Sequence, residues 1–347
     1  MARVLLTGAA GYIGSHTAVE LVNAGYDVVG VDNFSNSNPK VLEGIAGITG
    51  RPIDFVEVDC RDYEAFAKVF DRFPDIEAAI HFAASKAVGE SVQKPLMYYD
   101  NNIRGLVNLT RLMVERGKAA NIVFSSSCTV YGQPTKENLP ITEKAPLQPA
   151  TSPYGRTKQM CEDILTDCVK AYPGLSVTAL RYFNPIGAHP SAFIGELPNG
   201  VPQNLVPYIT QTAAGIRECL TVFGDDYNTP DGSCIRDYIY VVDLAKAHVK
   251  AIDRMLSAGD PSSERFEIFN LGTGRGLSVL ELVHAFERAT GVKLNYRIGP
   301  RREGDIEQVW ANPAKANEVL GWRADTPVEE VLASAWRWQQ RISSSTE

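Results

Sequence analysis

Long apolar runs are absent from this sequence of 347 residues, and cysteine and histidine are sparse. No stretch approaches the roughly 20 apolar residues needed to cross a bilayer, so we expect no membrane partner. The six cysteines and five histidines form no C-x-x-C pair and no spacing typical of metal ligands, which predicts no metal site. The chain begins without a basic leader before an apolar run, which favours a reduced, cytoplasmic enzyme.

Positive charge is also in short supply. The 34 Lys and Arg residues face 41 Asp and Glu residues, and the formal net charge is -7. This balance disfavours a nucleic-acid partner, and any phosphate-bearing ligand must find local donors against a repulsive background. The apolar fraction of 44% and the charged fraction of 22% are ordinary for a globular protein.

The sequence does contain a regular alternation of short apolar runs and amphipathic stretches. This alternation predicts an α/β fold, a Rossmann-type doubly wound parallel sheet with helices on both faces. We expect strands at 3–7, 27–32, 53–58, 78–82, 121–126 and 176–182, and helices at 13–24, 63–73, 97–116 and 153–171.

The regularity weakens after Asn184, where prolines and glycines become frequent. We therefore place a nucleotide-binding Rossmann domain at 1–184 and a smaller C-terminal α/β substrate lobe at 185–347. A strand and helix at about 235–256 are expected to return to the first domain.

A glycine-rich loop joins the first expected strand to the first expected helix. Residues 8–14 read GAAGYIG, with Gly8, Gly11 and Gly14 in a G-x-x-G-x-x-G pattern. Such glycines let backbone N–H groups approach a pyrophosphate at a helix N-terminus, although similar triplets occur in ordinary turns. Asp32, at the end of the second strand, is placed to bind the ribose hydroxyls and to repel a 2′-phosphate. The loop and Asp32 together predict NAD rather than NADP.

Other strand ends add candidate cofactor contacts. Asp59 follows the third strand, where it either caps the adenine side or serves as a turn residue. The small residues Ala83 and Ala84 after the strand at 78–82 allow close backbone approach, and Lys86 is placed to contact a ligand.

Three residues form a candidate catalytic group. Tyr154 and Lys158 lie four residues apart on an expected helix, and therefore on one face of it. A free tyrosine has a pKa of about 10 and needs a nearby ammonium to act as a base at neutral pH. Ser127 follows the strand at 121–126, where its hydroxyl is placed to bond the reacting oxygen. The three residues predict combined proton and hydride transfer.

The motifs together resemble the extended short-chain dehydrogenase/reductase superfamily and, within it, the UDP-glucose 4-epimerase family over nearly the whole chain. The resemblance rests on residues 7–15 (TGAAGYIGS), 83–91 (AASKAVGES), 98–102 (YYDNN), 125–132 (SSSCTVYG), 152–158 (SPYGRTK), 181–188 (RYFNPIGA), 232–239 (GSCIRDYI) and 301–305 (RREGD).

The resemblance implies a 4-epimerase of nucleotide-sugar metabolism that interconverts UDP-glucose and UDP-galactose. Carbon 4 is oxidised transiently, the 4-keto sugar rotates, and the hydride returns to its other face. Tyr154 would take the proton of the 4-hydroxyl, Lys158 would tune Tyr154 and hold the nicotinamide ribose, and Ser127 would bridge to the 4-oxygen.

The resemblance also implies two sets of ligand contacts. Those with NAD are Gly8, Gly11, Tyr12, Ile13, Gly14, Asp32, Asn33, Asn36, Ser37, Asp59, Cys60, Phe82, Ala83, Ala84, Lys86, Asn101, Ser125, Tyr154, Lys158 and Tyr182. Those with the UDP-sugar are Lys86, Ser127, Tyr154, Phe183, Asn184, Asn204, Leu205, Thr221, Phe223, Arg236, Arg302, Asp305 and Val309.

Two of these assignments have structural alternatives. Arg236 and Arg302 suit a diphosphate because each can donate paired hydrogen bonds, but each can instead form a salt bridge with Asp237 or Asp305. Phe223 lies either against the uracil or in the core.

The residues alone leave two alternative functions to be considered. A sugar-nucleotide 4,6-dehydratase shares the first oxidation but needs acids beside the strand-end hydroxyl, where this chain has Cys128 and Thr129. A protein that senses NAD without turnover would not need Tyr154 as a base.

Val309 bears on the choice of sugar. In the resembled family, epimerases restricted to glucose and galactose carry Tyr at this position, and smaller residues accompany N-acetylated substrates. Dense packing leaves no slack for an acetamido group beside a large ring, so Val309 predicts activity on UDP-GlcNAc and UDP-GalNAc as well. The alternative is that neighbouring loops refill the space. The resemblance also implies a homodimer through the helices at 97–116 and 153–171.

Overall fold

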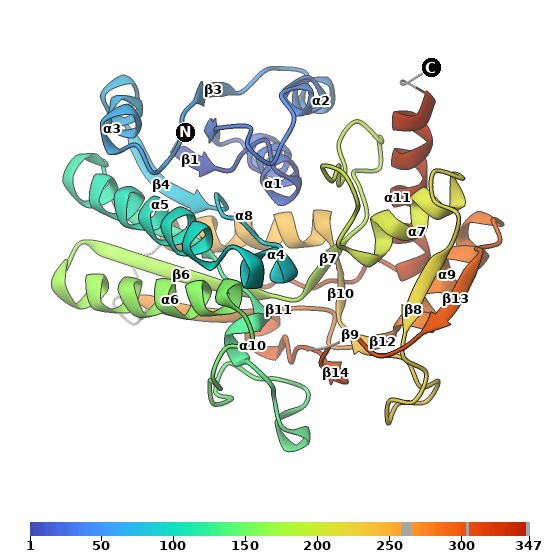
Figure 1. Ribbon diagram of the computed structural model, residues 1–347. Coiled ribbons are helices and arrows are strands. Elements are labelled where there is room, and N and C mark those ends of the chain that lie inside the picture. Colours follow the sequence, from blue (N-terminus) through green and yellow to red (C-terminus); the bar gives the residue numbers. More distant parts are fainter. Residues whose placement is uncertain (258–264, 303–304, 345–347) are drawn as a thin grey trace.

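A computed structural model describes residues 1–257, 265–302 and 305–344. Its larger part, here called the sheet domain, is built around seven parallel strands in the order β11-β6-β5-β4-β1-β2-β3 (Figure 1). The predicted doubly wound parallel sheet is confirmed. The strands are β1 (Arg3–Thr7), β2 (Asp27–Asp32), β3 (Asp54–Glu57), β4 (Ile76–His81), β5 (Ala120–Ser125), β6 (Leu175–Tyr182) and β11 (Phe266–Leu271).

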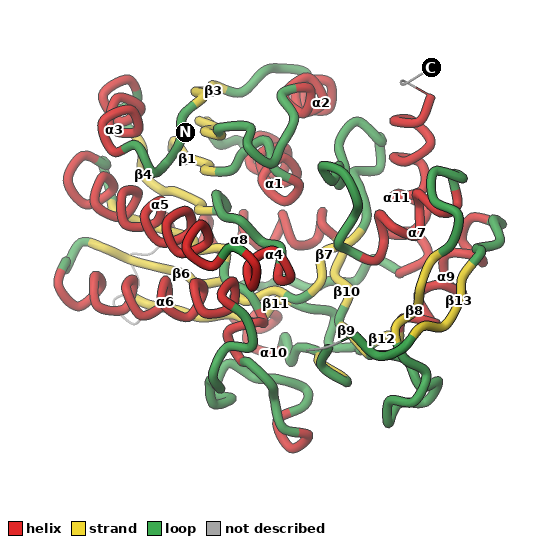
Figure 2. The backbone as a smooth tube through the Cα atoms, viewed as in Figure 1, coloured by secondary structure: helices red, strands yellow, loops and turns green. Residues whose placement is uncertain are grey.

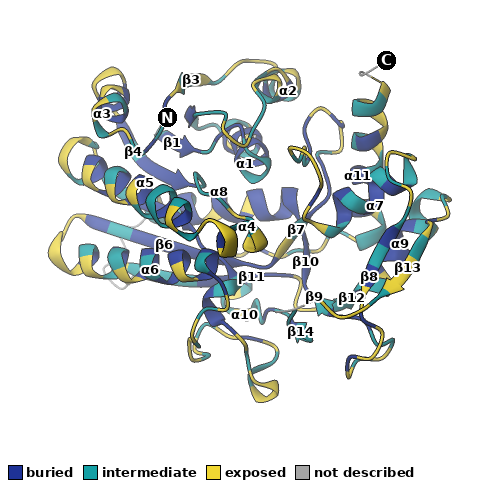
Figure 3. Ribbon diagram, viewed as in Figure 1, coloured by how far each residue is buried: buried dark blue, intermediate teal, exposed yellow. Residues whose placement is uncertain are grey.

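Helices cover both faces of this sheet because successive strand residues point to opposite sides. In β1, Val4 and Leu6 face one hydrophobic cluster and Leu5 faces the other. The burial colours of Figure 3 show the central strands as the most enclosed part of the sheet domain. One face carries α1 (Tyr12–Asn23), α2 (Lys40–Thr49) and α8 (Val241–Ser257), and the other carries α3 (Tyr63–Arg72), α5 (Pro95–Arg116) and α6 (Pro153–Ala171).

The strand order reverses between β1 and β4. In doubly wound sheets, ligands bind outside the carboxyl ends of strands at such a switch point. Gly8 follows β1, Asp32 ends β2 and Phe82 follows β4, so the candidate residues from three strands meet at one edge of the sheet.

Two later segments differ from expectation. Strand β11 lies in the part assigned to the smaller lobe, yet it pairs with β6 from Phe266↔Val177 to Leu271↔Tyr182. Of the segment 235–256, only α8 returns to the sheet domain, where it packs on α1. Its two strands, β9 (Ile235–Arg236) and β10 (Tyr238–Tyr240), pair in small sheets outside the main one.

The smaller lobe has its own core of side chains from several short strands and four helices, one of which is the start of α8. Figure 2 shows it beside the sheet domain, with more loop than regular structure. Its further elements are β7 (Asn184–Ile186), α7 (Leu205–Ala213), β8 (Leu220–Phe223), β12 (Leu277–Ser278), α9 (Val279–Thr290), β13 (Tyr296–Gly299), β14 (Gln308–Val309) and α11 (Val328–Ser344).

Four short helices complete the described chain: α4 (Val88–Gln93), α10 (Ala314–Val319) and the 3-10 helices η1 (Cys128–Tyr131) and η2 (Lys136–Asn138). Within the described residues, no helix has the length and apolar character that a membrane crossing requires.

Candidate active site

The glycine loop packs too tightly for side chains at two of its positions. Gly8 has a φ of +70°, and a Cβ atom there would lie 2.8 Å from the backbone nitrogen of Ala83. A Cβ atom on Gly14 would lie 2.1 Å from the carbonyl oxygen of Gly8. The loop therefore brings the start of α1 directly against the chain that leaves β4.

The N-terminus of α1 is open to an anion. Gly11 is the N-cap and provides no side-chain cap, and the first turn holds no acidic residue. The N–H groups of Tyr12, Ile13 and Gly14 start a helix of 12 residues, whose positive end faces this loop. The cradle of glycines and the uncapped helix together fit the pyrophosphate of a dinucleotide.

Asp32 is largely committed to the protein itself. Its carboxylate accepts hydrogen bonds from the backbone N–H groups of Ala10 and Phe34 and from Ser37 Oγ, at 2.9–3.0 Å. An ionised carboxylate offers about four acceptor sites, so a site remains for a ligand hydroxyl. Asp32 thus holds the loop after β2 and can still accept a hydrogen bond from a ribose hydroxyl. Asn36, in the same loop, is exposed.

Asp59 behaves as a turn residue. It accepts hydrogen bonds from the backbone and guanidinium of Arg61 and from Asn33 Nδ2. The hydrogen bonds from Arg61 lower the pKa of Asp59 to about 2. Its carboxylate is therefore ionised and held by Arg61, the second of the two roles that the sequence left open, although it still lies beside Asn33.

The remaining predicted cofactor contacts line the same edge. Phe82 packs on His248 of α8, with ring centres 4.7 Å apart. Asn101 donates to Ser85 Oγ and Asn102 Oδ1, and Cys60 is buried below α5. The hydroxyls of Ser125 and Tyr182 share a short hydrogen bond at the ends of β5 and β6.

Ser127, Tyr154 and Lys158 come together at the carboxyl end of β5. Ser127 is the N-cap of η1 and accepts hydrogen bonds from the N–H and Oγ1 of Thr129. Ser152 caps α6 by accepting from the N–H of Gly155, which starts the helix that carries Tyr154. Lys158 Nζ donates to the Ser125 carbonyl at 2.7 Å and lies 5.9 Å from the centre of the Tyr154 ring.

The protonation of this trio differs from the sequence expectation. Burial raises the pKa of the Tyr154 phenol above its usual value, and a hydrogen bond with Ser127 partly opposes this. Burial also lowers the pKa of Lys158 to about 8. Lys158 is therefore still mainly protonated at pH 7, but its presence does not lower the pKa of Tyr154 below normal. Both groups are shielded from water, which disfavours the charged form of each, so ionisation of Tyr154 depends on what the site binds.

A buried ion pair stands behind the catalytic strand. Glu162 lies one helical turn beyond Lys158 and forms a bidentate pair with Arg181 of β6, with both side chains at most 6% exposed. Ser126 also donates to Glu162. The four-residue spacing from Tyr154 through Lys158 to Glu162 places Glu162 on the same face of the helix, but it gives no sign of its partner Arg181.

On the smaller lobe, Arg236 and Arg302 meet at a common carboxylate. Arg302 lies 2.7 Å and Arg236 3.8 Å from Asp305 Oδ1. Glu303 and Gly304 of the same motif lie outside the described residues. The pairing of Arg236 with Asp237 that the sequence left open does not occur. Two guanidinium groups are thus gathered at one place, where a single carboxylate partly neutralises them.

Phe223 is not part of the core. It ends β8 with 42% of its surface exposed, and the Arg302 guanidinium lies 5.7 Å from its ring centre. Thr221 on the same strand accepts a hydrogen bond from Arg297. Asn204 and Leu205 begin α7 nearby in the same lobe.

Val309 lies next to both Arg236 of the paired arginines and the residues that follow Ser127 of the catalytic trio. It pairs in register with Arg236, and its side chain packs in a cluster with Phe183 and Cys128, the chain neighbour of Ser127. Asn184 starts β7, where it is exposed and its N–H donates to the carbonyl of Asp237. Val309 therefore lies between the cluster that includes Cys128 and the paired arginines.

Sequence reasoning missed the role of Asp237 beyond a surface pairing. This buried side chain accepts hydrogen bonds from Thr273, Gly274 and the N–H of Ala311, two residues after Val309. It therefore anchors two loops beside Arg236, the one after β11 and the one after β14. Glu196, which no motif singled out, contacts both Lys86 and Asn204.

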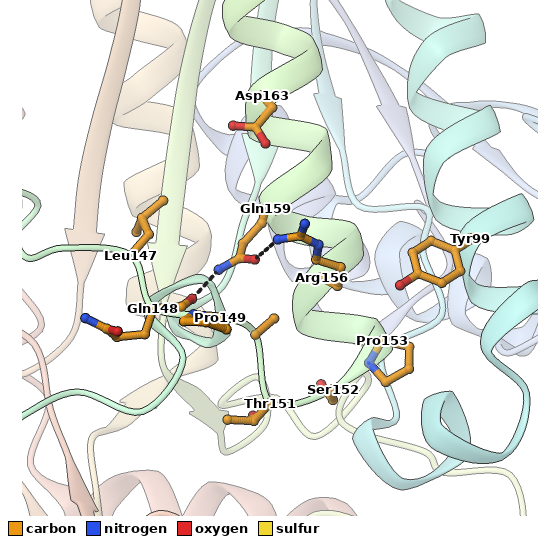
Figure 4. Close-up of a pocket in the computed structure, with 11 residues that line it drawn as sticks. Tyr99, Leu147, Gln148, Pro149, Thr151, Ser152, Pro153, Arg156, Gln159 and Asp163 are labelled. Atoms are coloured by element: carbon orange, nitrogen blue, oxygen red, sulfur yellow. Dashed lines mark hydrogen bonds between the residues drawn. The ribbon is translucent and has the colours of Figure 1, made fainter.

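A hollow of about 720 Å³ lies outside this site (Figure 4). It runs along α6 and includes Tyr99 of α5, Arg156 and Asp163, but none of the catalytic trio lines it. Gln159 closes one side by donating to the carbonyl oxygens of Val130 and Gln148. This hollow is a surface feature of the helices rather than the reaction site.

Comparison with known proteins places this arrangement in a family. Residues 5–335 match the family model described as GDP-mannose 4,6 dehydratase. The UDP-glucose 4-epimerase of Bacillus subtilis (strain 168) is 54% identical, with 97% of this chain and 96% of that protein aligned. The crystal structure of UDP-glucose 4-epimerase from Bifidobacterium longum in complex with NAD+ and UDP has a TM-score of 0.92, 46% identity and 99% coverage of both chains.

A more distant solved structure is the UDP-Glc/GlcNAc 4-epimerase of Campylobacter jejuni. It superposes with a TM-score of 0.83 and 34% identity over 98% of this chain and 100% of that one.

Proposed function

The chain belongs to the UDP-glucose 4-epimerase family, and on that basis we propose that it interconverts UDP-glucose and UDP-galactose with NAD as its cofactor. The reaction inverts carbon 4 through a transient 4-keto sugar. The observation that carries the proposal is the meeting of Ser127, Tyr154 and Lys158 with the glycine loop at the switch point of the sheet. The 4,6-dehydratase alternative is disfavoured, because Ser127 is followed by Cys128 and Thr129 and not by the acidic residues that elimination of water requires.

The chain's own residues would hold NAD in the following way. The N–H groups at the start of α1 would bind the pyrophosphate, and Asp32 would accept from the adenosine ribose. Phe82, directly after β4, and Tyr182, the last residue of β6, stand at the strand ends on either side of β5, which leads to Ser127. When bound, NAD supplies reversible hydride transfer at carbon 4.

The catalytic trio would move the proton. Tyr154 would take the proton of the sugar 4-hydroxyl during oxidation and return it after the sugar has turned. Ser127, whose hydroxyl lies close enough to Tyr154 to oppose the rise in its pKa, would hold the same oxygen and shorten the proton's path. Lys158, fixed on the Ser125 carbonyl, would stabilise the phenolate that forms.

The UDP end would be held by the smaller lobe. Arg236 and Arg302 are gathered for a diphosphate, whose charge would take over part of the role of Asp305. The exposed ring of Phe223 is available to stack on uracil. We further propose that residues 1–184 bind the cofactor and 185–347 mainly bind the UDP-sugar.

Retention of the cofactor is the direct test of the proposed reaction. Because the hydride returns to the same sugar, the enzyme has no need to release NAD between cycles. We expect acid-denatured protein to release about one NAD per chain, and the untreated protein to convert UDP-galactose without added NAD. A requirement for added NAD, together with net reduction of that NAD to NADH, would identify a dehydrogenase instead.

Val309 supports a wider substrate range. We propose that UDP-GlcNAc and UDP-GalNAc are also substrates, since Val309 lies between Arg236 and the cluster beside Ser127. Val309→Tyr is expected to lower kcat/KM for the N-acetyl sugar by about tenfold or more, because the ring fills the acetamido space. Turnover of UDP-galactose should persist.

Val309→Ala provides the matched control, because it keeps the space open and should retain both activities. An unmodified enzyme that fails to turn over UDP-GlcNAc would contradict the wider range, as would a Val309→Tyr variant with unchanged preference.

We also propose a cytoplasmic homodimer formed through α5 and α6. The apolar side chains of Leu96 and Val107 on α5 are exposed, and a second copy would cover them. The hollow of Figure 4 lies on the same helices and would receive part of the second copy. Light scattering should give twice the monomer mass, and a monomer at micromolar concentration would contradict the dimer.

All six cysteines are free, in keeping with a reducing compartment.

A further inference from the structure

A carboxylate that the proposed reaction does not use joins the two parts of the molecule. Glu196 lies in the loop between β7 and α7. Its Oε1 atom accepts hydrogen bonds from Lys86 Nζ at 3.2 Å and from Asn204 Nδ2 at 2.6 Å. Lys86 follows β4 of the sheet domain, whereas Asn204 begins α7 in the smaller lobe. The Glu196 Oε1 atom therefore binds two candidate ligand contacts, Lys86 from the sheet domain and Asn204 from the smaller lobe.

The Asn204 side chain is diverted from its usual local task. An asparagine at a helix N-cap normally accepts a hydrogen bond from an N–H group in the first turn. The Asn204 side chain makes no such bond and donates to Glu196 instead. This contact fixes the direction of the amide, while its oxygen and its second N–H remain for a ligand.

Glu196 itself stands on a fixed backbone. Its carbonyl oxygen accepts a hydrogen bond from Trp338 Nε1 of α11 at 2.9 Å. A Cβ atom on the preceding Gly195 would lie 2.5 Å from the Trp338 ring, so the loop lies flat against the indole. The carboxylate side chain is only 11% exposed. An anchored, nearly buried carboxylate can orient more flexible partners.

Lys86 is the flexible partner. Its side chain is 46% exposed and passes over the Tyr12 ring, with Nζ 5.7 Å from the ring centre. A carboxylate beside such a lysine can either compete with an anionic ligand or position the lysine for it. Lys86 has three donors and Asn204 has two on its amide, and each uses one on Glu196. A ligand therefore finds free donors on both without displacing Glu196, which favours positioning over competition.

We propose that Glu196 is a positioning residue that holds Lys86 and Asn204 in fixed relation across the two lobes, ready for the UDP-bearing ligand. Without it, both side chains would have to be ordered at the moment of binding, which weakens affinity. The inference rests on the proposed function, because UDP is the ligand for which these donors are arranged.

The test is the affinity of the purified holoenzyme for UDP, measured by isothermal titration calorimetry. Glu196→Ala should raise the Kd by about tenfold, because two donors lose their common anchor. Glu196→Gln keeps an acceptor oxygen for Asn204 but loses the charge that holds Lys86, so its Kd should be intermediate. In kinetics, KM for UDP-galactose should rise more than kcat falls. A Glu196→Ala Kd that is unchanged or lower than that of the unmodified enzyme would overturn the proposal.

Two further variants separate positioning from general structural damage. Glu77→Ala removes the carboxylate of another Lys–Glu pair, with Lys118 at 3.1 Å, at the amino ends of the strands, and it should leave the Kd unchanged. Trp338→Phe keeps an aromatic ring but loses the indole N–H that donates to the Glu196 carbonyl, so it should weaken UDP binding less than Glu196→Ala. An unmodified enzyme that does not bind UDP would contradict the proposed function, and the inference with it, whereas normal binding with an unaffected Glu196→Ala contradicts the inference alone.

Discussion

Tyr154→Phe is expected to lower kcat for UDP-galactose by about 10²–10⁴-fold, the usual contribution of a positioned acid–base group. Only the phenolic hydroxyl is removed, and the aromatic ring remains to fill the buried position near Ser127. KM should change little, because the UDP end of the substrate is held by the smaller lobe. Steady-state rates and the amount of bound NAD, measured on the same preparation, check the prediction.

Tyr172→Phe is the matched control, since Tyr172 ends the same helix with 46% of its surface exposed. It should retain full activity. If Tyr154→Phe keeps its cofactor and its kcat stays within about threefold of the unmodified enzyme, Tyr154 is not the base.

The second large effect concerns stability. Glu162→Ala should lower the free energy of unfolding by about 3–5 kcal/mol, because it leaves the Arg181 guanidinium buried without its anion. It also removes the acceptor of Ser126, which lies between Ser125 and Ser127. Urea unfolding followed by circular dichroism measures the loss.

An exposed ion pair offers the comparison. Asp71→Ala breaks the contact of Asp71 with Arg116, whose side chains are 65% and 37% exposed, and should cost less than about 1 kcal/mol. Equal losses from the two variants would show that burial does not govern the strength of the Glu162–Arg181 pair. Glu162→Leu with Arg181→Met should recover much of the stability, because no lone charge remains.

Most of the sheet domain was predictable because β1, β2, β4, β5 and β6 are largely buried on both faces and read as short apolar runs. The glycine loop, Asp32 and the pair Tyr154 and Lys158 were likewise visible, since their chemistry depends on spacing within one element. Strand β11 was not placed correctly, because strand order is decided by contacts between segments far apart in the chain. The same distance hid the contact of Glu196 with Lys86, which lies 110 residues earlier in the chain.

The pKa values of buried groups and the choice of ion-pair partners could not be predicted from the sequence either. The spacing of Tyr154 and Lys158 indicated a lowered tyrosine pKa, but burial acts on both groups and its extent cannot be read from spacing. Likewise, the sequence could not decide between Asp237 and Asp305 as the partner of Arg236. In the structure, the buried Asp237 accepts hydrogen bonds from two loops, whereas Asp305 lies beside both arginines.

The position of β11 affects the order in which the chain can be completed during synthesis. Until residues 266–271 have left the ribosome, β6 is an eight-residue edge strand with unpaired backbone groups. Such an edge is a template for pairing with another chain. The first 184 residues contain the glycine loop and the whole catalytic trio, yet a nascent or truncated chain that ends there would expose this edge to aggregation until the distant strand arrives to cover it.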